Sequence, residues 1–153
     1  MRTIVLIAHN LRSCHNVGSL LRTAEGLGVQ QVFLTGYTPY PLGPDDPRLP
    51  HMAAKITRQI NKTALGAETT QAWQRSDSID KVLAKLRGQG FTLAAIEQVK
   101  GSTPLPQYKP SQKIALLVGR EVEGIETEVL ARVDKVLEIP MFGTKESFNV
   151  AQA

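Results

Sequence analysis

The chain has 153 residues, of which 42% are hydrophobic and 21% are charged, and this is enough for one globular domain with its own core. No apolar run approaches the roughly 20 residues that span a bilayer, and the single cysteine, Cys14, excludes an internal disulfide, so a reducing cytoplasm is the expected setting. The net charge of +4 suits an anionic partner such as RNA, but many basic proteins bind no nucleic acid.

The first third of the chain alternates apolar runs with helical patterns. Thr3–Ala8 is typical of a strand buried on both faces, and no small-residue cleavage site follows it, so it is not a signal peptide. After a polar loop, Val17–Leu27 has helical spacing with Gly28 at its end, and Gln31–Thr35 indicates a second strand. Tyr37–Pro50 holds five prolines and two aspartates, which predicts an irregular loop.

The rest of the chain continues the alternation. Apolar stripes predict helices at His51–Leu65, Asp77–Arg87 and Glu126–Val133. Strands are predicted at Phe91–Ile96, Lys113–Val118 and Lys135–Ile139. This order predicts an α/β fold, a mostly parallel sheet with helices on both faces. No repeat or linker divides the chain, so residues 1–153 are expected to form a single domain.

Four loops follow the carboxyl ends of predicted strands, where open α/β sheets bind their ligands. They are His9–Arg22, the residues after Ile96, Val118–Ile125 and Ile139–Asn149. No G-x-G-x-x-G follows a strand and there is no P-loop, so these loops do not predict a dinucleotide or nucleoside triphosphate site.

Three of these loops hold polar residues that allow two interpretations. Asn16 could bind a ligand with Arg22 behind it, but a helix N-cap beside a solvated arginine is the commoner explanation. Gly119 permits close approach of a ligand to the backbone and Glu121 follows it, although a lone glycine after a strand is no fingerprint. Ser147, with Asn149 after it, is the expected N-cap of a final helix, whose amino end favours anions.

Two further groups of side chains have patterns of their own. Lys55, Arg58 and Lys62 share one side of a predicted helix, where they either bind phosphates or form a solvated face. The three histidines and Cys14 have no metal-ligand spacing, and no metal site is expected.

Together and in this order, three segments resemble the TrmH/SpoU branch of the SPOUT-class RNA methyltransferases. The segments are "HNVGSLLRTAEGLGV", "ALLVGREVEGI" and "IPMFGTKESFNVA". They carry the family's signature residues at Asn16, Arg22, Glu121, Ser147 and Asn149, and the resemblance runs from Thr3 to Ala153.

The resemblance implies a fold and a cofactor. The carboxyl-terminal part would be tied in a trefoil knot, which pattern reasoning alone does not propose. S-adenosylmethionine would bind in the knot between the loops after three strands. The residues expected to contact it are Ile96, Glu97, Val118, Gly119, Ile139, Met141 and Phe148, the last in place of the family's usual leucine. The helix after Ser147 is expected to be cut to about one turn at Ala153.

The resemblance also implies the reaction, methyl transfer to a ribose 2′-hydroxyl of RNA by a homodimer. Asn16, Arg22, Glu121, Ser147 and Asn149 would be the catalytic set. Arg22, Lys55, Arg58 and Lys62 would contact RNA, with tRNA favoured over rRNA because the chain resembles the minimal members of the family. Two alternatives are a non-catalytic RNA-binding protein with the same fold and an unrelated α/β enzyme with another adenine cofactor.

Overall fold

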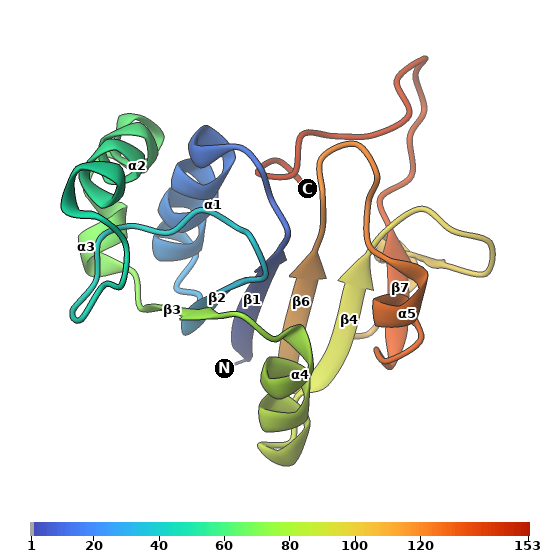
Figure 1. Cartoon of the computed structure of the whole chain (residues 1–153). Helices are drawn as coiled ribbons and strands as arrows, with labels where there is room; N and C mark the ends of the chain where they lie inside the picture. The colour runs from blue at the N-terminus through green and yellow to red at the C-terminus, as the bar shows by residue number, and fades with distance from the viewer. Residues whose placement is uncertain (1) are drawn as a thin grey trace.

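The computed structural model describes residues 2–153 and contains one parallel sheet (Figure 1). Among these residues the sheet has seven strands in the order β3-β2-β1-β6-β4-β7-β5, and every pairing is parallel. The strands are β1 Thr3–His9, β2 Gln31–Thr35, β3 Trp73–Ser76, β4 Thr92–Ile96, β5 Thr103–Pro104, β6 Lys113–Val118 and β7 Lys135–Glu138. The predicted α/β class with a mostly parallel sheet is therefore confirmed.

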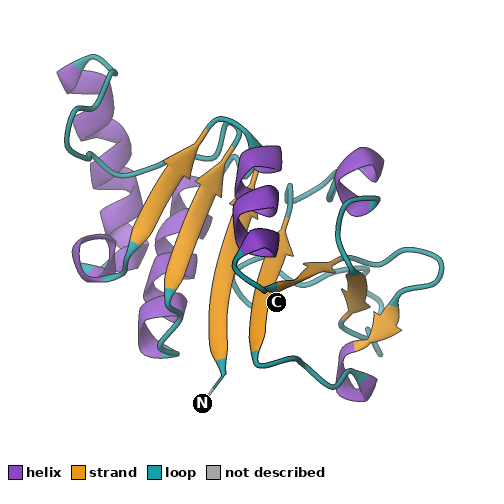
Figure 2. Ribbon diagram, turned by 90° about the horizontal axis from the view of Figure 1, so that it is seen from below, coloured by secondary structure: helices purple, strands orange, loops and turns teal. Residues whose placement is uncertain are grey.

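Helices lie in front of the sheet and behind it (Figure 2). They are α1 Cys14–Gly26, α2 Pro50–Ala64, α3 Ala67–Thr70, α4 Ile79–Gly88 and α5 Thr127–Leu130, with a short 3-10 turn at Leu105–Gln107. α1 packs against one face together with α2 and α3, and α4 and α5 cover the other. No helix described in the structure is long and apolar enough to cross a membrane.

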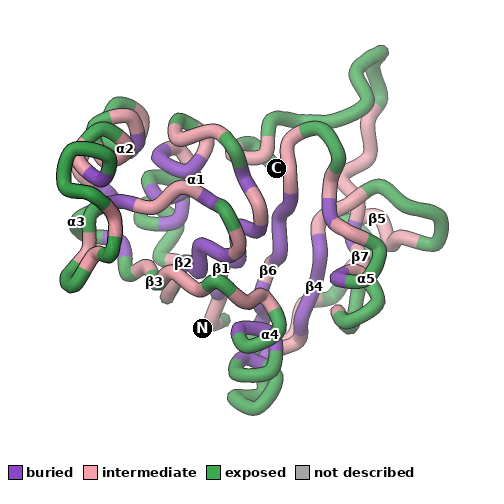
Figure 3. Tube along the Cα trace, in the orientation of Figure 1, coloured by how far each residue is buried: buried purple, intermediate pink, exposed green. Residues whose placement is uncertain are grey.

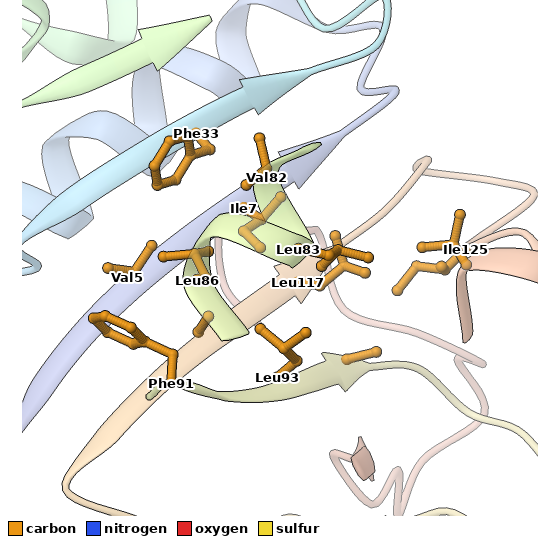
Figure 4. Close-up of a cluster of buried hydrophobic side chains, with 13 residues drawn as sticks. Val5, Ile7, Phe33, Val82, Leu83, Leu86, Phe91, Leu93, Leu117 and Ile125 are labelled. Atoms are coloured by element: carbon orange, nitrogen blue, oxygen red, sulfur yellow. The ribbon is translucent and has the colours of Figure 1, made fainter. Parts of the chain in front are cut away.

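The sheet buries two large apolar clusters, one on each face, and a smaller third cluster of Ala94, Ile114 and Leu137. Val5 and Ile7 of β1 point towards α4 and pack with Val82, Leu83 and Leu86 (Figure 4). Residues of β1 and β2 on the other face pack under α1. The central strands are thus apolar on both faces, which explains why their sequences are continuous apolar runs.

α1 and α2 touch backbone to backbone at Gly18. A Cβ atom at this position would lie 2.2 Å from the carbonyl oxygen of Ile60 and 2.2 Å from Oγ1 of Thr63. Only glycine allows this approach, and it fixes α2 beside the amino-terminal half of α1.

The carboxyl-terminal segment returns from one half of the sheet to the other. It leaves β7, extends away from the body, and then runs past the loop after β6 to reach α1 (Figure 1). Most of it is exposed (Figure 3), but Val150 and Ala151 pack against the cluster under α1. The trefoil knot stays a prediction.

Several sequence predictions of element boundaries were wrong. α1 begins at Cys14 with Ser13 as its N-cap, so Asn16 lies in the first turn and does not cap the helix. α3, β3 and β5 were missed because they are only two to four residues long, and β3 and β5 are edge strands without a full apolar pattern. The helix predicted at Glu126–Val133 is only the single turn of α5.

The helix predicted after Ser147 is also absent, and a turn occupies residues 150–152. Asn149, and not Ser147, caps this turn, because its Oδ1 accepts a hydrogen bond from the backbone N–H of Ala151 at 2.9 Å. A single turn closes too few backbone hydrogen bonds to count as a stable helix.

Candidate functional site

A cavity of about 150 Å³ opens at the carboxyl edge of the sheet. The loops after β4, β6 and β7 and the turn at residues 150–152 surround it. All seven residues predicted to contact a cofactor line it: Ile96, Glu97, Val118, Gly119, Ile139, Met141 and Phe148. Ile96 and Phe148, 52 positions apart in sequence, therefore meet at one site, as expected where parallel strands end side by side.

The loop after β6 is closely packed against the cavity. A Cβ atom at Gly119 would lie 2.4 Å from Cγ1 of Ile125, so the strand can turn into this loop only with glycine. Glu97 ties the loop to the end of β4, because its carboxylate accepts hydrogen bonds from the backbone N–H groups of Ile125 (2.9 Å) and Gln98 (3.0 Å). These contacts make the wall between β4 and β6 rigid.

Glu121 joins the loop after β6 to the start of α1. Its carboxylate accepts hydrogen bonds from the backbone N–H of Arg12 at 3.2 Å, from that of Ser13 at 3.1 Å and from Asn16 Nδ2 at 3.1 Å. Partial burial pushes the pKa of Glu121 up, but the hydrogen bond from Asn16 and those from the backbone outweigh it and hold the pKa below its usual value. Glu121 is therefore a firmly ionised anchor.

Asn16 connects Glu121 to the carboxyl-terminal turn by hydrogen bonds. Its Oδ1 accepts a hydrogen bond from Nδ2 of Asn149 at 3.1 Å, while its own Nδ2 donates to Glu121. The amide orientation follows from these two partners, since a carboxylate accepts only from the nitrogen. Three of the five predicted catalytic residues thus form one chain of hydrogen bonds.

A groove of about 730 Å³ lies on the α1 side of this chain. Asn16, Arg22 and Asn149 line it from α1 and the carboxyl-terminal turn, and Lys62 lines it from α2. Both Arg22 and Lys62 are exposed. The groove therefore offers two cations beside two amide side chains, a combination that suits a phosphate group.

The predicted residues are not all gathered in one pocket. Ser147 and Glu121 line the cavity, whereas Asn16, Arg22 and Asn149 line the groove. Lys55 and Arg58 are exposed on α2 but belong to the lining of neither.

Sequence reasoning missed Arg12 and Ser13, whose backbone N–H groups bind Glu121. A signal for them existed, because residues just before a helix have free N–H groups that favour a carboxylate. Their side chains gave no such signal.

A second polar network lies at the end of β1. His9 is buried, and its Nδ1 is 2.9 Å from Oγ1 of Thr35, while Asn10 donates to Glu126 at 2.9 Å. Burial lowers the pKa of His9, the charge of Glu126 raises it in part, and Arg120 lowers it again. His9 is thus a satisfied core residue, and among residues 2–153 no group of three His, Cys, Asp or Glu side chains has the geometry to hold a metal ion.

Comparison with known proteins identifies a family to which the chain is similar. Residues 3–153 match the SpoU rRNA Methylase family. A 23S rRNA (guanosine-2′-O-)-methyltransferase from Neisseria meningitidis serogroup B is 27% identical over 148 residues, which are 97% of this chain and 53% of that protein. The chain thus spans about half the length of this relative.

Solved structures share the fold. An AdoMet-bound rRNA methyltransferase from Sinorhizobium meliloti has a TM-score of 0.79 at 22% identity over 98% of this chain and 52% of its own. A structure described in terms of 2-OH methylation on tRNA has a TM-score of 0.77 at 24% identity and is covered to 88% by this chain, which is 99% covered in turn.

Proposed function

The chain belongs to the SpoU rRNA Methylase family, and we propose that it transfers a methyl group from S-adenosylmethionine to a ribose 2′-hydroxyl of RNA. The observation that carries this proposal is the meeting of two sites, a cavity with apolar and acidic walls and a basic groove, at one chain of hydrogen bonds from Glu121 through Asn16 to Asn149. The N. meningitidis relative is named for the same reaction.

The cavity has the chemistry that S-adenosylmethionine needs. Ile96, Val118 and Ile139 provide apolar walls for the adenine ring, and the carboxylates of Glu97 and Glu121 provide negative charge for a sulfonium. Gly119 leaves backbone groups accessible beside the ligand. When bound, the cofactor supplies an already activated methyl group, so the protein chiefly has to align the acceptor hydroxyl with it.

The groove would hold the RNA backbone. The Arg22 guanidinium carries hydrogen-bond donors and no acceptor, so we do not assign it the role of base. It would instead orient a phosphate or stabilise the alkoxide that develops on the 2′-oxygen. Lys62 faces the same groove and would contact a neighbouring phosphate.

The hydrogen-bonded chain would hold the cavity and the groove in a fixed position relative to each other. Glu121 has a lowered pKa and several N–H donors on its carboxylate, so it holds the start of α1 and does not remove a proton. Asn149 would hold the carboxyl-terminal turn, and Ser147 would close the cavity beside Phe148.

The class of RNA, the cellular location and the oligomeric state are also proposals. tRNA is favoured over rRNA as substrate, because the chain covers 88% of the structure described for tRNA methylation and much less of the rRNA enzymes. The protein would act in the cytoplasm as a homodimer, with the carboxyl-terminal segment knotted around the cofactor.

Transfer of a labelled methyl group to total tRNA and to rRNA tests the proposal. The full chain should label RNA, and Arg22→Ala should lower labelling by about 10²-fold or more, because it removes charge stabilisation of the transition state. Arg2→Ala is the matched control, since Arg2 is exposed and lies outside the lining of both sites. No labelling of any RNA by the wild-type chain would refute the proposal.

Calorimetry separates the enzyme from a non-catalytic RNA-binding protein. The enzyme binds S-adenosylmethionine, whereas a binding module binds only RNA. Charge reversal at Lys55, Arg58 and Lys62 should weaken RNA binding and leave cofactor binding unchanged, and unchanged RNA affinity would remove these residues from the RNA-binding surface.

A further inference from the structure

The proposed reaction releases a proton, and the carboxylates of the cavity are not free to take it. Methyl transfer forms a bond to the ribose oxygen, so the proton of that hydroxyl has to leave. Glu121 accepts hydrogen bonds from Asn16 and from the start of α1. The two carboxylate oxygens of Glu97 accept from the backbone N–H groups of Gln98 and Ile125. Both acids that line the cavity therefore hold the structure together.

The groove contains a different proton acceptor. Among the described residues that line it there is no carboxylate, and its cations, Arg22 and Lys62, have donors only. The hydroxyl and amide side chains that line it are very weak bases. His15 also lines the groove, and histidine is the side chain that gains and loses a proton between about pH 5 and 8. His15 is therefore the group of the groove best suited to accept a proton.

His15 lies at the cavity side of the groove. It belongs to the first turn of α1, next to Asn16, whose Nδ2 donates to Glu121 of the cavity wall at 3.1 Å. Arg22 is seven residues further along the same helix, which is about 10 Å along its axis. Seven residues are about two helical turns, so both side chains share one face of α1 and line the same groove. His15 is thus much closer to the cavity wall along α1 than Arg22 is.

The backbone of His15 is fixed, and its side chain is accessible. Oγ1 of Thr63 donates to the carbonyl oxygen of His15 at 2.7 Å, and Gly18, three residues further on, packs against the backbone of α2. His15 is exposed, whereas His9 is buried with its ring beside Thr35.

The charges around His15 are both positive. Arg22 of α1 and Lys62 of α2 share the groove with it, and residues 149–152 add only amide and apolar side chains to the lining. Cations of this kind hold an anionic RNA backbone and leave the proton to the imidazole.

We infer that His15 is the general base of methyl transfer and accepts the proton of the ribose 2′-hydroxyl. As the bond between the 2′-oxygen and the methyl carbon forms, the carbon–sulfur bond of the methyl donor breaks, and its electron pair stays on sulfur. The hydroxyl proton passes to a ring nitrogen of His15 and then to water. Arg22 and Lys62 hold the adjoining phosphates. This inference rests on the proposed function.

Replacement of His15 tests this role under single-turnover conditions, which isolate the chemical step. His15→Ala and His15→Gln should each lower the rate of methyl transfer by about 10²- to 10⁴-fold, the usual contribution of a general base. The wild-type rate should rise between about pH 5 and 8 and level off above this window, and both variants should lack this step. Affinity for S-adenosylmethionine, measured by calorimetry, and the melting temperature should not change.

His51→Ala is the matched control. His51 is exposed on α2 and lines neither the cavity nor the groove, so this variant should keep the wild-type rate and pH dependence.

The outcomes separate the base from the proposed function. If the wild-type chain methylates RNA and His15→Ala does so at the same rate, the base is overturned and the function stands. A slow variant that keeps the wild-type pH dependence also overturns it. So does a loss of RNA affinity, measured by fluorescence anisotropy, as large as the loss of rate, since His15 would then act in binding. If the wild-type chain methylates no RNA, the proposed function fails and the base fails with it.

Discussion

The two walls of the cavity are built in different ways. The wall formed by the loop after β6 is held by hydrogen bonds from Glu121 to the start of α1, a helix that packs closely against α2. The opposite wall is exposed over residues 142–149, with Phe142 97% and Phe148 47% accessible. Asn149 is the link between them. One wall is thus fixed by the folding of the core, and the other depends on few contacts.

The strongest test of this contrast is to add one methyl group to the helix pair that supports the first wall and one to the exposed wall. Gly18→Ala forces a Cβ atom against the backbone of α2, and overpacking of this kind costs about 1–3 kcal/mol of unfolding free energy. At about 2–4 °C per kcal/mol, thermal unfolding should show a clearly lowered melting temperature. Gly143→Ala, with nothing within 4 Å of the new atom, should melt like wild type. Equal melting temperatures in the two variants would contradict the contrast.

Glu121→Gln removes the carboxylate that holds the loop after β6 to the start of α1. The variant loses charge-assisted hydrogen bonds worth about 1–3 kcal/mol and should also lose most methyl transfer. Because folding lowers the pKa of Glu121, its stabilisation is present above the unfolded value of about 4.3 and is lost as pH falls through the folded value.

Urea unfolding as a function of pH checks this sign. The stability difference between wild type and Glu121→Gln should be constant near neutral pH and should shrink below pH 4.3 or so. A difference that grows as the solution is acidified would show that the carboxylate does not stabilise the fold.

Asn149→Ala tests the comparison by removing the hydrogen bond to Asn16 that links the two walls. The residue is exposed, so the free energy of unfolding should fall by only about 1 kcal/mol or less. Affinity for S-adenosylmethionine, measured by calorimetry, should fall more than stability does, because the exposed wall is no longer held to Asn16. Unchanged affinity would mean that the exposed wall has other support.

The smallest expected effect concerns His9, which lies outside both walls. Its pKa is lowered on folding, so the unfolded chain binds more protons between the folded value and about 6.5. Stability should therefore rise with pH through this window and level off above it. Titration of the His9 ring by NMR should give a pKa below 6.5, and a value above it would contradict burial as the dominant cause.

The sequence was most informative where packing determines structure. The continuous apolar runs of β1 and β6 and the helical stripe of α1 predicted a parallel sheet, and the loops after its strands predicted where the cavity lies. Edge strands such as β5 were missed because two residues carry no periodicity. The pattern of side chains in a sequence does not predict contacts that the backbone makes.

The candidate site shows the same limit. Motif order pointed to Asn16, Glu121 and Asn149, yet the role of Asn16 as a bridge depends on a helix that begins at Cys14, three residues earlier than the expected Val17. The backbone donors of Arg12 and Ser13 depend on the same boundary. Tertiary packing sets such boundaries, and local residue preferences are too weak to do so.

The central claim is that the cavity and the groove together methylate a ribose hydroxyl, and alkaline hydrolysis of labelled RNA tests it most directly. A methylated 2′-oxygen cannot attack the neighbouring phosphate, so the chain next to it resists alkali. After incubation of the full chain with labelled S-adenosylmethionine and tRNA, the account predicts that the label appears in alkali-resistant dinucleotides. Label recovered only in mononucleotides would show methylation of a base and contradict the account.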